Sequence, residues 1–392
     1  LRSNSNTSEA FADVATGNDT GYVRLLGAYK NAHDYTDGAG EEVRSGFTSY
    51  DGQALVGWTP DADTRLELGV GTTQGEDVKY VGMMDAPETT NDSYRLRFDR
   101  GASTLGFDAV AARLYYNDVH HVMDNYSLPG RDPVSDPNKM PMRVPSDSLT
   151  YGGRASGDLS LGGGEWTVGV DYRFNNRDAI RYSGSSENAV SNEQSYMWPD
   201  ADLSRTGLFV EGDQPVGVGE LRLGLRVDRV VADANASDYS QAAATPDDLY
   251  SQYYDDVTEG DEATETNVGG VARYRRPVGK LSALFAGVSR TVRTADATER
   301  YIASKSGMGD WVGNPGIDPE KHHQAEVGLE TGKKDWSAEG SVYYNRITDY
   351  ILRDTARGQA GIRKDNDANI YRNVDAYQAG AELALEALWA GN

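Results

Sequence analysis

Apolar and polar residues alternate in the stretch Leu221-Arg222-Leu223-Gly224-Leu225-Arg226-Val227-Asp228. Side chains of a β-strand point alternately to its two faces, so the four apolar residues share one face and the glycine and the charged residues share the other. The stretch Trp166-Thr167-Val168-Gly169-Val170-Asp171-Tyr172-Arg173-Phe174 repeats this pattern. Each stretch therefore predicts a strand with one apolar face and one polar, charged face.

Two architectures use strands of this kind. A soluble sandwich packs the apolar faces into a core, whereas a membrane barrel turns them to lipid and turns the charged faces to its lumen. The chain has 392 residues, a net charge of -23 and a mean hydropathy of -0.62. It contains no run of about 18 apolar residues, so we expect no transmembrane helix. A membrane barrel stays open, because its alternating strands give only a weak hydropathy signal.

The order of the connections distinguishes these two architectures. We expect about fifteen strands, and the clearest segments are 21–31, 52–59, 64–73, 92–99, 104–119, 149–161, 165–177, 205–213, 219–232, 266–276, 280–293, 323–331, 336–352 and 374–389. Tight polar connections alternate with long ones at 32–48, 74–91, 120–148, 178–204, 233–265, 294–322 and 353–373. An up-and-down barrel has short turns at one rim and long loops at the other, whereas a sandwich does not segregate its loops in this way. We therefore predict an all-β chain that forms an antiparallel, up-and-down transmembrane β-barrel.

Charge and composition exclude several function classes. The acidic balance argues against a nucleic-acid partner, whose phosphates require a basic surface. The absence of cysteine excludes disulfides, thiol catalysis and Cys-based zinc sites within this sequence. The sequence contains no Gly-x-Ser-x-Gly, His-Glu-x-x-His or phosphate-binding loop, and Ser127 near His121 is a poor candidate for a hydrolase pair. We therefore predict no enzyme, no catalytic residue and no bound cofactor.

The predicted lumen face carries many charges, and buried charges must be paired or hydrated. We expect this face to be wet or to pair with another part of the protein. The residues concerned are Arg24, Arg65, Glu67, Arg95, Arg97, Arg113, Arg173, Arg222, Arg226, Glu326 and Glu330. His322 and His323 are adjacent in a predicted strand and fall on opposite faces, so we interpret them as structural rather than as one metal site.

Three segments resemble TonB-dependent outer-membrane receptors. They are Gly313–Gly328 with its Asn-Pro, Pro-Glu and Glu-x-Gly elements, Ser341–Ile351, and Tyr371-Arg372-Asn373-Val374-Asp375-Ala376 followed by Gly380 and Glu382. The resemblance implies a barrel of roughly 22 strands with an N-terminal plug, in the outer membrane of a Gram-negative bacterium. It also implies contact with outer-membrane lipid, and work with the inner-membrane TonB complex through the plug. We expect residues 1–392 to be an incomplete part of the barrel domain, without the plug and the last strands.

Within this family the chain is most similar to the copper-receptor branch. The residues that carry this likeness are His121-Val122-Met123-Asp124-Asn125-Tyr126, Met140-Pro141-Met142, Leu149-Thr150-Tyr151-Gly152-Gly153-Arg154 and Met83-Met84-Asp85. The resemblance implies that copper ions are the transported ligand. It also implies that a His-x-Met pair on the barrel supplies ligands, and that a Cys and a Met of the plug complete the site.

The residues themselves suit copper. Thioether sulfur is a soft ligand that selects Cu(I), and imidazole binds Cu(I), Cu(II) or zinc. His121 and Met123 are two residues apart, so in an extended segment both side chains point the same way. Met140 and Met142 have the same spacing, with Pro141 keeping the backbone extended. We predict metal ligation by His121 and Met123 and transient capture by Met140 and Met142; the alternative is that these methionines fill apolar gaps under a folded loop.

Two other functions remain open. A receptor of the same fold could take an iron-siderophore or another bulky organic ligand, for which the tyrosine-rich segment with Tyr250, Tyr253 and Tyr254 is a candidate contact surface. A surface β-protein with an adhesive or structural role and no transport is an alternative of a different class.

Overall fold

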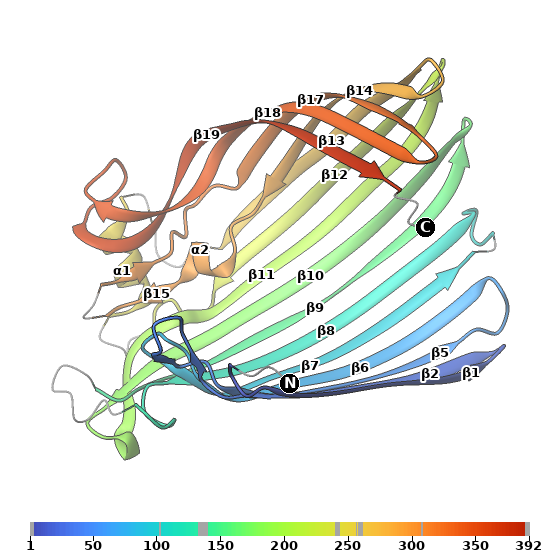
Figure 1. The fold of residues 1–392 in the computed structure, drawn as a ribbon. Coiled ribbons are helices and arrows are strands. Elements are labelled where there is room, and N and C mark those ends of the chain that lie inside the picture. Colours follow the sequence, from blue (N-terminus) through green and yellow to red (C-terminus); the bar gives the residue numbers. More distant parts are fainter. Residues whose placement is uncertain are drawn as a thin grey trace.

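The computed structural model of this protein describes residues 4–101, 103–131, 140–239, 244–255, 257, 262–306 and 309–388. Its main element is one sheet of 17 strands that curves into a wide trough (Figure 1). None of the described helices is long and apolar enough to cross a membrane. The sheet therefore makes up almost the whole of the described structure.

Fifteen of the 17 strands form a meander in which each strand is antiparallel to the next. They are β1 (Ser8–Asn18), β2 (Gly21–Ala32), β5 (Phe47–Trp58), β6 (Thr64–Val78), β7 (Asp85–Arg100), β8 (Ala109–Asp124), β9 (Met142–Leu161), β10 (Gly164–Gly184), β11 (Val190–Val216), β12 (Gly219–Ala234), β13 (Ala263–Val278), β14 (Ser282–Arg293), β17 (Glu320–Lys333), β18 (Trp336–Arg357) and β19 (Asp365–Ala387). This confirms the predicted antiparallel order and the predicted number of strands.

The remaining elements lie in the connections at one end of the sheet. They are β3 (Tyr35–Thr36), β4 (Glu42–Val43), the short 3-10 helix η1 (Glu187–Ala189), α1 (Pro246–Tyr253), α2 (Ala297–Tyr301), β15 (Ala303–Ser304) and β16 (Trp311–Val312). Short turns gather at one end of the trough, and α1, α2 and β15 lie at the other (Figure 1). The β9–β10 turn shows why the short turns are tight: Gly162 and Gly163 both have positive φ, 63° and 79°, as a two-residue hairpin loop requires. The predicted long connections are present at 33–46, 125–141, 235–262 and 294–319, all at the same end of the sheet. The predicted loops at 74–91, 178–204 and 353–373 are instead short connections at 79–84, 185–189 and 358–364, because the flanking strands extend into them.

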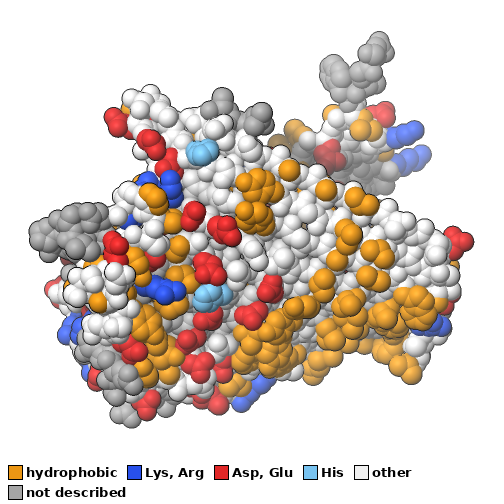
Figure 2. Space-filling view, turned by 90° about the horizontal axis from the view of Figure 1, so that it is seen from below, with side chains coloured by type: hydrophobic (Ala, Val, Ile, Leu, Met, Phe, Trp, Pro, Cys, Tyr) orange, Lys and Arg blue, Asp and Glu red, His pale blue; other side chains and the backbone are white. Residues whose placement is uncertain are grey.

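The outer face of the sheet is apolar over a continuous band. Leu208 is 62% exposed and Leu383 is 72% exposed, although both are large apolar residues. Figure 2 shows such side chains gathered in a band on the lower face of the trough, with Asp and Glu beside it toward the long connections. Tyrosine pairs lie on the same face, with ring centroids 5.3 Å apart for Tyr29–Tyr50 and 6.0 Å apart for Tyr94–Tyr116. Such a band with aromatic residues is the surface that a barrel presents to lipid.

The inner face carries the charges that the sequence pattern assigned to it, and many of them are paired within one strand or across neighbouring strands. Arg226 of β12 contacts Asp171 of β10 at 2.6 Å and also bonds to Asp228. Further pairs are Arg24–Asp13, Arg65–Glu67, Arg97–Asp99, Arg113–Asp99, Arg222–Asp213, Arg273–Glu326 and Arg275–Glu330. These residues of the inner face are therefore paired, which is one of the two expected outcomes for the lumen face.

The structure corrects several details of the sequence prediction. Residues 178–204 are mostly strand instead of loop, because β10 continues to Gly184 and β11 begins at Val190. These strand ends extend beyond the apolar band, where polar residues stand on both faces and the alternation disappears. The strand β1 was missed because its outward positions next to β2 include the small residues Ala10 and Ala12, which give little apolar contrast.

The sheet has two free edges. Within the described part of the chain, β1 pairs only with β2, and β19 pairs with β18 and, over two residues, with β16. The edges formed by β1 and β19 stand apart across the opening of the trough (Figure 1). The sheet is therefore curved like a barrel wall without being closed.

Candidate metal site

The predicted metal ligands lie at the long-connection ends of β8 and β9. Backbone pairing places Met123 opposite Val144 and His121 opposite Ser146. His121 and Met123 share the face of Arg113, which is the inner face of the sheet. The structure therefore confirms that both side chains belong to the same face of one strand, as their spacing predicted.

His121 is held by a hydroxyl group of the preceding strand. Its Nδ1 lies 2.6 Å from Oγ1 of Thr89, the residue directly opposite on β7. The lipid-facing band ends before this position, because Tyr116 is followed on the outer face by the polar Asp118 and His120. The pKa of His121 is lower than the usual 6.5, mainly because the imidazole is buried and also because the charge of His120 is close to it. The imidazole of His121 is therefore neutral, and available to a metal, at pH values where a free histidine is already partly protonated.

His120 is adjacent in sequence but belongs to the opposite face. Its Nδ1 lies 2.7 Å from Oδ1 of Asp147 on β9. Strand alternation separates its imidazole from that of His121. The two neighbouring histidines therefore cannot act as a chelating pair.

Asn125 holds the backbone of Met140 and Met142 next to the end of β8, where His121 and Met123 lie. The Asn125 amide donates to the carbonyl oxygen of Met140 at 3.0 Å and accepts from the backbone N–H of Met142 at 2.8 Å. Met142 opens β9 two residues before the partner of Met123, so it shares the inner face. The sulfur of Met140 accepts a hydrogen bond from Nε2 of Gln194 at 3.4 Å, and it is therefore engaged by β11.

Further thioethers lie at the same end of the sheet as His121 and Met123. The described part of the chain holds no group of three or more His, Cys, Asp and Glu side chains placed to bind a metal ion. Met83, in the neighbouring connection between β6 and β7, is 57% exposed at the same end of the sheet. A metal held here by His121 and methionines would meet soft ligands, which favour Cu(I) over zinc.

Sequence reasoning missed the residues that position the ligands. Thr89 was assigned to an irregular connection, and only the extension of β7 back to Asp85 brings it opposite His121. Asn125 belongs to the motif around His121 and Met123, but nothing in its sequence context shows that it bridges two segments 15 residues apart. Asp85, which follows Met83 and Met84, is fully buried and accepts from Arg131 at 2.9 Å and from Arg44. It therefore ties three connections together.

The tyrosines considered for an organic ligand are buried. Tyr250 donates to the carbonyl oxygen of Tyr301 at 2.6 Å, and Tyr254 donates to that of Val312 at 2.8 Å. Burial raises the pKa of Tyr253 to about 12, and its hydroxyl is bonded to Asp310 and Asn366. These rings form a small core with Leu249 of α1 and with β15, β16 and the β18–β19 tip, so they are not presented to a ligand.

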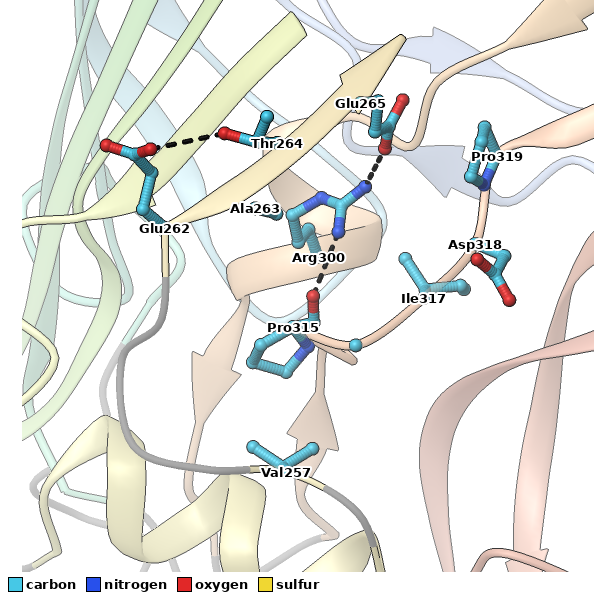
Figure 3. A pocket seen from close by; sticks show the side chains of 11 residues that line it. Val257, Glu262, Ala263, Thr264, Glu265, Arg300, Pro315, Ile317, Asp318 and Pro319 are labelled. Carbon is cyan, nitrogen blue, oxygen red and sulfur yellow. Dashed lines mark hydrogen bonds and ion pairs between the residues drawn. The ribbon is translucent and has the colours of Figure 1, made fainter. Parts of the chain in front are cut away.

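A cavity of about 280 Å³ lies beside this core, between the start of β13 and the segment Pro315–Pro319 (Figure 3). Arg300 of α2 points into it and is buried. Its guanidinium donates to the carbonyl oxygen of Pro315 at 2.9 Å and to the carboxylate of Glu265. The bond to Pro315 closes the 294–319 connection on itself, and the bond to Glu265 holds it against β13, so we interpret this arginine as structural.

The Ser127–His121 pair considered for a hydrolase is not formed. The hydroxyl of Ser127 donates to Asp124 at 2.8 Å instead of to His121. His322 bonds to Glu320 and Asn345 on the inner face, whereas His323 is on the outer face. The predicted separation of the two histidines is thus confirmed.

Comparison with known structures finds several outer-membrane transporters. The copper transporter OprC is 28% identical, with a TM-score of 0.76 over 98% of this chain and 57% of that chain. The hemophore receptor HasR of Serratia marcescens, solved as a double mutant with its hemophore HasA and heme, is 17% identical with a TM-score of 0.73, over 98% of this chain and 59% of that chain. The FrpB iron transporter from Neisseria meningitidis is 14% identical with a TM-score of 0.65, over 99% and 58%.

The chain thus spans a little over half the length of these proteins. A search of the curated proteins finds no match. Residues 27–392 match the family described as TonB dependent receptor-like, beta-barrel, which is a family of receptors and not of enzymes. The chain therefore belongs to the TonB-dependent receptor family and is located in the outer membrane of a Gram-negative bacterium.

Proposed function

We propose that this chain is part of a receptor that captures copper ions at the cell surface and imports them with energy supplied by the TonB complex. The observation that carries the proposal is the pair formed by His121 and Met123, which share the inner face of β8 at its outer end. The greater identity to the copper transporter, 28% against 17% for the hemophore receptor, supports the same choice. Copper is the cargo in this proposal and not a resident cofactor.

The hydrogen bond of His121 prepares the imidazole for a metal. When Nδ1–H donates to the Thr89 hydroxyl, the lone pair of Nε2 is free to coordinate an ion. Met123 adds a soft sulfur from the same face, two residues along the strand. Met140 and Met142 then serve as transient capture ligands, because Asn125 keeps their backbone next to the end of β8.

The partners follow from the family and the surface. Transport requires the TonB complex, which in this family acts through a plug, and the outer band contacts outer-membrane lipid. The net charge of -23 argues against a nucleic-acid partner. A siderophore or other organic ligand remains the second candidate, since iron and heme receptors share the fold. The burial of Tyr250, Tyr253 and Tyr254 argues against it.

The test is metal affinity of the full-length receptor in detergent, with Cu(I), Cu(II), zinc and iron offered in competition. We expect selective copper binding that weakens at least 10-fold, as loss of a metal ligand implies, in the double variant His121→Ala/Met123→Ala. The variant His120→Ala is the matched control, because it removes the adjacent imidazole from the other face of the same strand. In the variant Met140→Ala/Met142→Ala we expect copper to bind more slowly, while the equilibrium affinity for copper stays that of the wild type. Equal copper affinity of the double variant and the wild type would sink the proposal.

A further inference from the structure

Three basic residues stand side by side on the outer face of the sheet. Backbone pairing places Arg290 of β14 opposite His323 of β17, and His323 opposite Arg346 of β18. All three share the outward positions of Val288, Val327 and Val342, which are exposed. The three side chains therefore form one basic row across neighbouring strands.

None of the three has an acidic partner in the described part of the chain. Arg290 donates only to the carbonyl oxygen of Val268, and neither His323 nor Arg346 has a polar contact there. Lys321, two residues from His323, is instead paired with Asp349 at 2.6 Å. Like charges directly opposite each other destabilise a sheet, so an unpaired basic row in a chain of net charge -23 points to an anionic partner from outside the chain.

An apolar groove of about 540 Å³ adjoins this row. Its floor is the next outward row of the sheet, in which Ala272, Val288, Ala325 and Tyr344 are paired across four strands. Arg290 and His323 line its upper end. The small side chains of Ala272 and Ala325 account for the hollow, which Tyr344 lines on the β18 side.

The position of the row matches the headgroup level of the outer leaflet. β14 rises from the short turns at Ser282 toward the long connection after Arg293, and Arg290 lies near that upper end. Along β18 the outward face changes from Tyr344 to Arg346 in one step, and aromatic residues mark the edge of the hydrocarbon layer. The groove is therefore continuous with the lipid-facing band, and the basic row is at the level of lipid phosphates.

The opposite wall of the barrel has the reverse charge at the same level. Beyond Tyr116 the outer face of β8 carries Asp118 and His120, and His120 is bonded to Asp147. Asp147 is directly opposite Asp178. Asp and Glu side chains also gather beside the apolar band on the face seen in Figure 2. The carboxylates there repel an anionic headgroup, whereas the basic row attracts it.

We propose that Arg290, His323 and Arg346 bind the phosphate of a lipopolysaccharide molecule, one acyl chain of which occupies the adjoining groove. Guanidinium groups bind phosphate through paired, charge-assisted hydrogen bonds. Basic clusters at the membrane surface recognise anionic lipid headgroups. The site is separate from the copper ligands of β8 and does not depend on the proposed transport function.

The test is binding of purified lipopolysaccharide to the delipidated full-length receptor in neutral detergent. Dioleoyl phosphatidylglycerol and inorganic phosphate serve as comparison probes. We expect lipopolysaccharide to bind at least 10-fold more tightly than either comparison probe. Affinity should fall at least 10-fold in Arg290→Gln/Arg346→Gln and in the groove-filling variant Ala272→Trp/Ala325→Trp.

The matched control is Arg276→Gln/Lys280→Gln, which removes the same charge from exposed residues at the short-turn end of β13. It should keep wild-type affinity, and all variants should keep the wild-type melting temperature. Unchanged lipopolysaccharide affinity in a folded Arg290→Gln/Arg346→Gln variant would overturn the proposal. Equal affinity for phosphatidylglycerol would overturn the assignment to lipopolysaccharide.

Discussion

The Asp34 carboxylate organises the connection between β2 and β5. Its oxygens accept from the backbone N–H groups of Ser45 and Gly46, at 2.9 and 2.7 Å, and from Nζ of Lys79 at 2.9 Å. Burial alone would raise the pKa of Asp34, but these three donors outweigh it and lower the pKa to about 2, from 3.8. A carboxylate with a depressed pKa stabilises the folded connection at any pH above its unfolded value.

This gives a pH prediction for a single residue. Hydrogen-exchange protection of the Ser45 and Gly46 amides should be constant from neutral pH to about 4. It should then fall as the pH passes from 3.8 toward 2, where Asp34 is protonated. In Asp34→Asn both amides should be poorly protected at every pH, whereas Asp37→Asn should behave as the wild type. Full protection at pH 2 in the wild type would contradict this role.

The positions of individual site residues could be predicted only where the spacing along one strand fixes the face on which they lie. The two-residue spacing placed His121 and Met123 on one face, and alternation separated His322 from His323. The contact between Thr89 and His121 was not predictable, because it depends on pairing in a strand end that lacks an apolar alternation. Partners that arrive through register or long connections leave no local signal in the sequence.

At the scale of elements, the connections at the upper end contain a structured unit of their own. Leu249, Tyr250 and Tyr253 of α1 are buried against Val312 of β16 and Ile370 of β19. A capping box between Thr245 and Asp248 begins the helix. The sequence suggested only a tyrosine-rich loop here, since eight helical residues within a long polar connection are too few to show a periodic pattern.

Removing the Leu249 side chain should release this unit from the wall of the barrel. Leu249→Ala deletes a fully buried side chain and should cost about 2–5 kcal/mol of local stability. We expect faster proteolysis within α1, while copper affinity at His121 stays the same, because β8 contributes nothing to this core. The exposed Leu281→Ala is the control. Proteolysis at the wild-type rate would show that α1 is held by other contacts.

For the whole molecule, strand order and the two faces of the sheet were predictable, because alternation and connection length repeat along the chain. The way in which the inner face is neutralised was not predictable, since ion pairs such as Arg226–Asp171 join residues 55 positions apart. The same holds for the basic row of Arg290, His323 and Arg346, which exists only in the paired sheet. The sign of each charge can be read from the sequence, but the pairing register of the strands decides which charges become neighbours.

The free edges at β1 and β19 set the stability of the sheet as a whole. Every residue of β1 is exposed, and its outer edge has no pairing partner in the described part of the chain. Backbone groups left unpaired in lipid cost several kcal/mol each, which is why barrels that span membranes are closed. We therefore expect residues 1–392, expressed alone in detergent, to show no cooperative melt by circular dichroism. The full-length receptor should melt cooperatively at high temperature. A sharp melt of the isolated chain that does not depend on protein concentration would mean that its edges are satisfied without further strands.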